Sequence, residues 1–104
     1  MDTPNIITLD LTGCKYLREL HERIRAAFDF PDWYGKNWDA FWDLLSEPRD
    51  YTVVEIKGFN SLPKDLQPSG QKMLEIMQRN KEEEEKFMKK YPQFDYRFEY
   101  RVID

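Results

Sequence analysis

Three short β-rich segments are separated by long stretches of helical periodicity, and this order constrains the fold more than any other feature of the chain. The segments cover residues 6–11, 51–57 and 94–102 of 104. Antiparallel strands can be joined by a tight hairpin, whereas parallel strands need a long crossover, usually a helix. With right-handed crossovers, the order predicts an α/β fold, a small three-stranded parallel sheet packed with three to four helices.

The last β-rich segment has the clearest strand pattern. Aromatic or aliphatic side chains occupy every second position from Phe94 to Val102, and charged side chains occupy the positions between them. A period of two predicts a strand with one buried and one solvated face.

The first helix is predicted over residues 15–28, where apolar side chains recur at spacings of three and four. Its outer face carries Arg18, Glu22 and Arg25, together with His21, the only histidine. We therefore expect His21 to be a solvated surface residue and not a metal ligand or a catalytic group. Pro31 ends this element, because the residue before a proline is disfavoured in helical geometry.

A second helix is predicted from Trp38 to about Ser46. Asn37 is a favourable N-cap for it, and Pro48 prevents its continuation. In the loop before it, Gly35 is expected to adopt a backbone angle that other residues resist.

A third, long helix is predicted over residues 71–90. The preceding residues contain three helix breakers (Pro63, Pro68 and Gly70). They predict a loop with one short helix around residues 63–66. Residues 78–86 have no apolar side chain, so this part of the long helix is expected to be a solvated extension.

Length and composition indicate one soluble domain. A chain of 104 residues can form one core, and we expect a single domain over residues 1–104. Cys14 is the only cysteine, which excludes an intrachain disulfide and a cysteine-based metal site. Neither a membrane-spanning apolar run nor a signal-peptide pattern is present, so we expect a cytoplasmic protein, and no cofactor is indicated.

The negative charge of the chain is concentrated in one segment. Residues 29–50 contain six carboxylates and two basic side chains, so this segment accounts for the whole net charge of −4. A localised acidic field repels nucleic acid and attracts a basic protein. It therefore favours a protein partner over a nucleic acid.

Residues 32–43 combine all three tryptophans with aspartates. At 100° per residue, Trp38 falls on the helical arc that faces the core, with Phe41 and two leucines. Asp39, Asp43 and Glu47 follow one another at intervals of four on a different face, and Trp42 lies at the seam. A half-exposed aromatic beside carboxylates has the composition of an interface hot spot. We therefore predict a surface that binds a basic protein.

Other functions also fit parts of this pattern. Asp39 favours the helix dipole, so a merely solvated acidic surface is one alternative. A second is a glycosidase using Asp39 and Asp43, although glycosidase carboxylates must flank the scissile bond and these lie side by side. A third is a non-enzymatic carbohydrate- or protein-binding module using exposed Trp33 and Trp42. A fourth is a divalent-metal site on Asp39, Asp43 and Glu47, but calcium wants six or more oxygen ligands.

Residues 34–45 resemble the signature of the barstar family, inhibitors of barnase-type ribonucleases. The matching positions are Tyr34, Gly35, Asn37, Asp39, Ala40, Trp42, Asp43 and Leu45. The resemblance implies a three-stranded parallel sheet packed with helices, without enzymatic activity. It also implies a one-to-one complex with a basic extracellular or toxin ribonuclease, no direct contact with nucleic acid or membrane, and a monomer when free.

The resemblance further implies which residues contact the nuclease. Asp43 takes the place of the substrate phosphate, paired with arginines and the catalytic histidine of the nuclease, and Asp39 makes a second charged contact. The remaining surface is formed by Trp33, Gly35, Asn37 and Trp42. No catalytic or metal-binding residue is implied.

The chain departs from the family pattern at several positions. Lys36 stands where the family carries an acid, which weakens the acidic field and suggests a different target. Trp38 replaces a smaller apolar residue. An acidic contact on the last helix of the family falls near Gln78 and Arg79, neither of which is acidic, and residues 81–90 look like an insertion.

Overall fold

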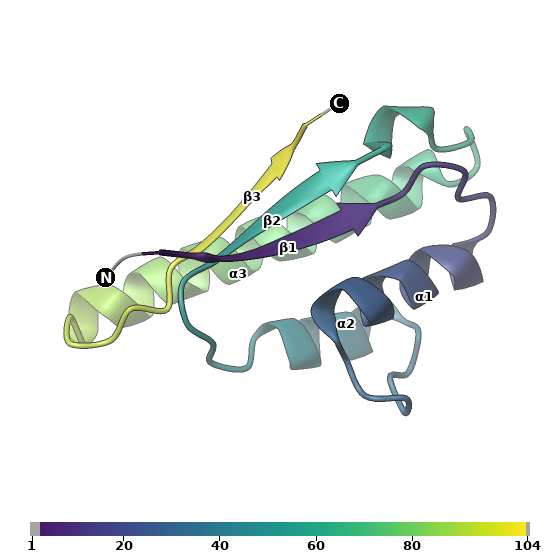
Figure 1. Cartoon of the computed structure of the whole chain (residues 1–104). Helices are drawn as coiled ribbons and strands as arrows, with labels where there is room; N and C mark the ends of the chain where they lie inside the picture. Colours follow the sequence, from purple (N-terminus) through teal and green to yellow (C-terminus); the bar gives the residue numbers. More distant parts are fainter. Residues whose placement is uncertain (1–2, 104) are drawn as a thin grey trace.

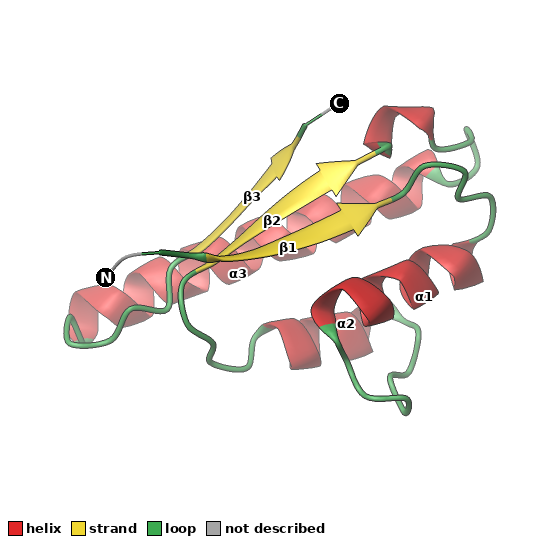
Figure 2. Cartoon of the chain, in the orientation of Figure 1, coloured by secondary structure: helices red, strands yellow, loops and turns green. Residues whose placement is uncertain are grey.

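The structure, a computed structural model, describes residues 3–103 and contains a three-stranded parallel sheet (Figures 1 and 2). The elements in chain order are β1 (Asn5–Asp10), α1 (Leu17–Phe28), α2 (Trp38–Leu45), β2 (Thr52–Lys57), the 3₁₀-helix η1 (Phe59–Ser61), α3 (Gln67–Lys90) and β3 (Phe98–Val102). The predicted α/β class and the parallel pairing are therefore confirmed. Within residues 3–103, no helix is long and apolar enough to cross a membrane.

Strand β2 is the central strand of the sheet, and only one face of the sheet packs against the core. The strand order is β1-β2-β3, and Leu9 of β1 lies opposite Ile56 of β2. Both side chains are completely buried, whereas Glu55 and Arg101 on the other face form an ion pair of 2.8 Å. Both crossovers advance across the sheet in the same direction, so right-handed connections bring all three helices to the same face.

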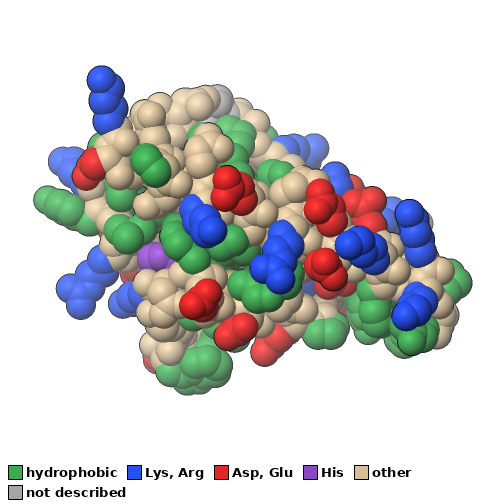
Figure 3. All heavy atoms as spheres, turned by 180° about the vertical axis from the view of Figure 1, so that it is seen from behind, with side chains coloured by type: hydrophobic (Ala, Val, Ile, Leu, Met, Phe, Trp, Pro, Cys, Tyr) green, Lys and Arg blue, Asp and Glu red, His purple; other side chains and the backbone are tan. Residues whose placement is uncertain are grey.

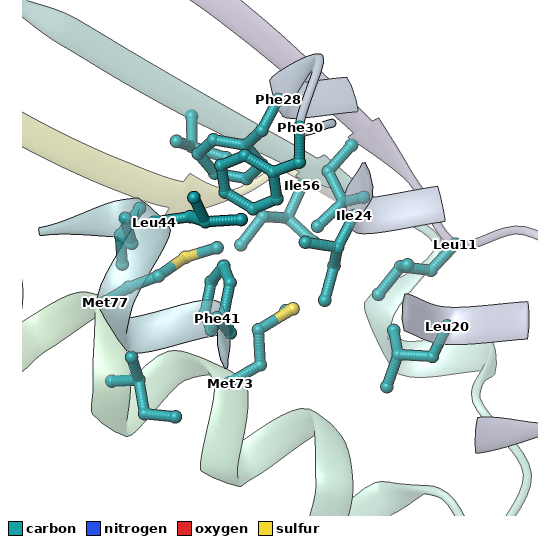
Figure 4. Packing of buried hydrophobic residues seen from close by; sticks show 14 of the residues in the cluster. Leu11, Leu20, Ile24, Phe28, Phe30, Phe41, Leu44, Ile56, Met73 and Met77 are labelled. Atoms are coloured by element: carbon teal, nitrogen blue, oxygen red, sulfur yellow. The ribbon is translucent and has the colours of Figure 1, made fainter. Parts of the chain in front are cut away.

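The core lies between this face of the sheet and the three helices. Figure 4 shows Phe41 of α2 beside Met73 of α3, with Ile24 of α1 and Ile56 of β2 close by. All four side chains have no exposed surface. Each helix therefore contributes a continuous apolar stripe to one core, as the spacing of apolar residues predicts.

The strand predicted over residues 94–102 is shorter in the structure. Strand β3 begins at Phe98, which lies opposite Thr52, the first residue of β2. The backbone N–H of Thr52 still donates to the carbonyl of Arg97 at 2.9 Å, but β2 begins too late in the sequence to pair with Phe94 or Tyr96. Phe94 and Tyr96 instead pack against Phe87 of α3, with ring centroids 5.9 and 5.6 Å from it.

The long helix starts earlier than the sequence predicts, and the predicted start at residue 71 is wrong. Helix α3 begins at Gln67, four residues earlier than expected, and Pro68 lies in its first turn. Backbone N–H groups in the first turn have no partner within the helix, so a proline is tolerated there. Gly70 lies inside the helix and gives room to Leu62, whose Cδ1 would be 2.9 Å from an added Cβ.

Two further expectations for this region also change. The short helix is η1 at Phe59–Ser61, not around residues 63–66. The prediction of a solvated extension is wrong for Asn80, which is 2% exposed. The next residue, Lys81, forms an ion pair of 2.9 Å with Glu99 of β3. The middle of α3 is therefore partly covered by β3 and α2.

Gly58 closes β2 in a conformation that only glycine can adopt without strain. Its φ is +73°, and an added Cβ would lie 2.4 Å from the backbone nitrogen of Thr12. We predict that Gly58→Ala lowers the free energy of unfolding by about 3 kcal/mol, because left-handed strain adds to a backbone clash. Urea unfolding of the variant tests this value.

Gly13 provides the matched control. Its φ is +77°, but no atom lies within 4 Å of an added Cβ. Gly13→Ala should therefore cost only the strain, about 1 kcal/mol. Equal losses for the two variants would show that the contact with Thr12 has no energetic weight.

Candidate partner-binding face

Helix α2 is held by its cap and by its packing. It has only eight residues, and isolated helices of this length are not stable in water. The Oδ1 of Asn37 accepts a hydrogen bond of 2.8 Å from the backbone N–H of Ala40, as the predicted N-cap requires. Phe41, Leu44 and Leu45 are buried, so the predicted inner side of α2 is confirmed.

The outer side of α2 carries Asp39 and Asp43. Both are exposed, and they lie four residues apart, so their carboxylates stand one turn above the other. The last turn of α2 contains no basic residue. Glu47 lies two residues beyond the last helical residue, Leu45, so helical geometry places only two of the three predicted carboxylates in this column.

Trp42 lies between the core side and the acidic side of α2. It is half-buried and packs against the core, and the guanidinium carbon of Arg79 lies 4.1 Å from its ring centroid. Such a cation–π contact contributes about 0.5–1 kcal/mol at an exposed site. This contact cannot be predicted from the sequence, because α2 and α3 meet only in the folded protein.

The other two tryptophans lie in different surroundings. Trp33, in the loop before α2, is 75% exposed. Trp38 is half-buried against the core, with its ring 5.8 Å from that of Phe41 and 4.4 Å from that of His21. Trp33 is therefore available to a partner, whereas Trp38 packs the first turn of α2 against the core.

His21 is buried, and the prediction of a solvated surface histidine is wrong. It is 1% exposed, and its Nδ1 lies 2.7 Å from the hydroxyl oxygen of Tyr34. Part of the signal is present in the sequence, because His21 precedes Ile24 by three residues and Phe28 by seven, and both of these side chains are buried. His21 thus extends the apolar stripe of α1 toward α2.

Tyr34 fixes the loop that precedes α2. It is 4% exposed, its backbone N–H donates to the carbonyl of Pro31 at 2.9 Å, and its ring lies 5.4 Å from that of Phe30. Burial raises the pKa of the Tyr34 hydroxyl, so it remains protonated next to His21. The loop that carries Trp33 is therefore attached to the core.

The left-handed residue of this loop is Lys36, with a φ of 51°, and not Gly35 as predicted. Gly35 is needed for space, since an added Cβ would lie 3.1 Å from Nδ2 of Asn37 and 3.2 Å from Cβ of Ala40. The Nδ2 of Asn37 also donates to the carbonyl of Gly35 at 3.1 Å. Glycine therefore allows the capping side chain to fold back over the loop.

The surface around α2 carries both signs of charge. Figure 3 shows acidic and basic side chains interspersed with hydrophobic ones on the side of the molecule where α3 lies in front of the sheet. The ammonium group of Lys36 lies 3.6 Å from Glu22. Within residues 3–103, no group of three or more histidine, cysteine or acidic side chains is arranged to hold a metal ion.

Comparisons with known proteins agree with the fold and with the sequence motif. Residues 5–94 match the protein family described as Barstar (barnase inhibitor). The Bacillus subtilis (strain 168) protein named "Putative ribonuclease inhibitor YrdF" is 32% identical over 78 residues, which cover 74% of this chain and 86% of that protein.

The burial of His21 predicts a specific dependence of stability on pH. Burial, reinforced by repulsion from Lys36, lowers the pKa of His21 from 6.5 to about 4 in the folded protein. Below pH 6.5 His21 is protonated in the unfolded chain but still neutral in the folded protein. The free energy of unfolding therefore falls by up to about 3 kcal/mol by pH 4. Above pH 6.5 the residue is neutral in both states and contributes no slope.

Urea unfolding at several pH values, with His21→Leu as the comparison, tests this. The difference in stability between the parent and His21→Leu should be constant above pH 6.5 and change by about 3 kcal/mol in favour of the variant on going to pH 4. Tyr34→Phe, which keeps the histidine, should retain the slope of the parent. A parallel pH dependence of the parent and His21→Leu would contradict the assignment.

Proposed function

The chain is a member of the barstar family, and from this premise we propose that it inhibits a basic ribonuclease by blocking the active-site cleft with α2 and the loop before it. The observation that carries the proposal is the exposure of Asp39 and Asp43 on a helix whose opposite side is fixed in the core. The chain acts by stoichiometric binding and not by turnover.

The chemistry of an RNA-cleaving site explains why carboxylates suit this task. A cleft that binds RNA must offer positive charge to the phosphates. Asp43 takes the place of a substrate phosphate and pairs with arginines and the catalytic histidine, and Asp39 makes a second charged contact. A carboxylate carries the negative charge of a phosphodiester but has no bond that the nuclease can cleave.

The rigidity of α2 supports this mechanism. The cap at Asn37, the burial of Phe41 and the attachment of the loop through Tyr34 hold the face in one conformation before the partner arrives. A preorganised surface loses less conformational entropy on binding. Trp33 and Trp42 add apolar contact area beside the carboxylates, and Gly35 and Asn37 complete the surface.

Lys36 reduces the acidic field less than its position in the motif suggests. Its ammonium group lies 3.6 Å from Glu22, so part of its charge is offset within the chain. Asp39 and Asp43 therefore still present a negative field to a basic partner. Lys36 then affects which nuclease can bind, because it repels a basic residue of the partner that lies opposite it.

The partner is a secreted or toxin ribonuclease, bound one to one. The free inhibitor is a monomer in the cytoplasm and acts as an immunity protein that protects the cell from this ribonuclease. Neither nucleic acid nor a membrane takes part in the complex.

We predict that Asp43→Asn weakens inhibition strongly. The substitution keeps the shape of the side chain but leaves the basic groups of the nuclease buried without a counter-charge, which costs about 3 kcal/mol or more, roughly a hundredfold in affinity. RNA cleavage by a barnase-type ribonuclease, followed during titration with each protein, measures the effect.

Asp65→Asn is the matched control, because Asp65 is an exposed carboxylate in the turn before α3. It should inhibit as the parent does, with the same one-to-one endpoint. If Asp43→Asn titrates as sharply as Asp65→Asn, the carboxylate of Asp43 does not enter the cleft.

Association with the nuclease should depend steeply on salt. Opposite fields steer the two proteins together, and these fields are screened as the ionic strength rises from about 50 to about 500 mM. Stopped-flow association of the parent should slow steeply over this range, and the double variant Asp39→Asn/Asp43→Asn should show a flatter dependence. An association rate of the parent that does not change with salt would exclude steering by this face.

A further inference from the structure

Helix α1 and the loop before α2 share an array of four alternating charges. The Nε of Arg25 donates to Glu22 at 2.9 Å, and its Nη1 lies 3.6 Å from a carboxylate oxygen of Asp32. Glu22 also lies 3.6 Å from the ammonium group of Lys36. Asp32 and Lys36 stand on either side of Trp33 in the sequence, and Trp33 is 75% exposed. The array therefore borders the tryptophan that the loop presents.

This array differs in charge from α2. Asp39 and Asp43 are exposed, and residues 37–48 contain no lysine or arginine. Carboxylates alone suit any cleft that binds the phosphates of RNA, so they do not distinguish one ribonuclease from another. Lys36 is the only basic residue in the segment 29–48. It can discriminate between nucleases, because specificity depends on repulsive as well as attractive contacts.

The backbone of Lys36 has an unusual conformation for a lysine. Its φ is 51°, in the left-handed region. Residues with a Cβ are disfavoured there, and glycine or asparagine adopts this conformation more readily. Backbone strain of this kind is found preferentially at functional sites. The loop therefore carries a lysine at a position where local conformation does not favour one.

Stability does not explain the ion pair between Lys36 and Glu22. The two side chains are 39% and 45% exposed, and exposed ion pairs contribute little to stability. Glu22 is also held by Arg25, whose hydrogen bond lowers the pKa of the Glu22 carboxyl. Glu22 therefore remains ionised and in place when Lys36 turns toward another carboxylate. The flexible side chain of Lys36 is thus a cation that a partner can recruit.

We propose that Lys36 is a specificity-determining residue that pairs with a carboxylate on the rim of the nuclease cleft, while Asp39 and Asp43 enter its basic interior. This inference rests on the proposed function for the kind of partner, and it adds the chemistry of the rim. Glu22 acts as a positioning residue, because it holds the ammonium group of Lys36 until the partner binds. A nuclease with a uniformly basic rim is disfavoured by repulsion.

Charge reversals on both proteins test this pairing. The probes are a barnase-type ribonuclease and a set of its variants, in each of which one lysine or arginine of the cleft rim that is not needed for cleavage is replaced by glutamate. Inhibition constants from RNA cleavage are compared for the parent, Lys36→Glu and Lys64→Glu. Lys64 is exposed in the turn before α3, so Lys64→Glu changes the net charge equally but lies outside the proposed face.

Lys36→Glu should inhibit the unaltered ribonuclease about tenfold more strongly than the parent, because a repulsion is replaced by an attraction. Lys64→Glu should change the inhibition constant by less than about twofold. On the rim variant whose glutamate faces Lys36, the order should reverse, and the parent should be the stronger inhibitor by about tenfold. Thermal unfolding checks that each variant is folded.

Glu22→Gln separates an effect on the partner from an effect within the chain. In this background the reversal should persist but shrink about threefold, because the lysine is no longer held in place. If Lys36 acted only through Glu22, Lys36→Glu would have no effect on inhibition in the Glu22→Gln background. Such a result would overturn the proposal.

The remaining outcomes separate this inference from the proposed function. If the parent inhibits, and Lys36→Glu and Lys64→Glu have equal inhibition constants on every nuclease of the set, the inference is overturned and the proposed function stands. An improvement by Lys36→Glu without a reversal on any rim variant would overturn the pairing with a carboxylate. If neither the parent nor Lys36→Glu inhibits any of the nucleases, the proposed function fails and the inference fails with it.

Discussion

The packing of Phe41 determines how α2 is oriented, and the rest of the surface depends on that orientation. The side chain is completely buried, and its ring meets those of Phe28, Phe30 and Trp38 at centroid distances of 6.0, 6.4 and 5.8 Å. A rotation of α2 about its axis would pull this ring out of the core. Asp39 and Asp43 are therefore held outward by a contact on the opposite side of the helix.

The loop before α2 is held in a similar way, by groups behind it. His21 and Tyr34 share a buried hydrogen bond, and Trp38 lies against His21 at 4.4 Å. The three residues come from α1, the loop and α2, so they join the segments that form the proposed face. Asn37 then closes the first turn of α2. Because these segments are already ordered, they lose little conformational entropy when a partner binds.

Local rules predicted the elements that depend on local groups. The N-cap at Asn37, the division of α2 into an apolar and an acidic side, and the parallel sheet all follow from residues close in sequence or from the length of the crossovers. Predictions failed where the outcome depends on a distant segment. Phe94 reads as part of a strand, but β2 starts too late to pair with it.

The sequence by itself determined the order of strands and helices, the acidic-aromatic composition of residues 32–43, and the motif that marks the family, because each is a property of neighbouring residues. Only the tertiary structure decided that His21 meets Tyr34 and Trp38, that Arg79 lies over Trp42, and that Asn80 lines a groove beside α2. Each of these depends on two segments that come into contact only after the chain has folded. The separation of the two segments along the sequence does not indicate that they will be in contact.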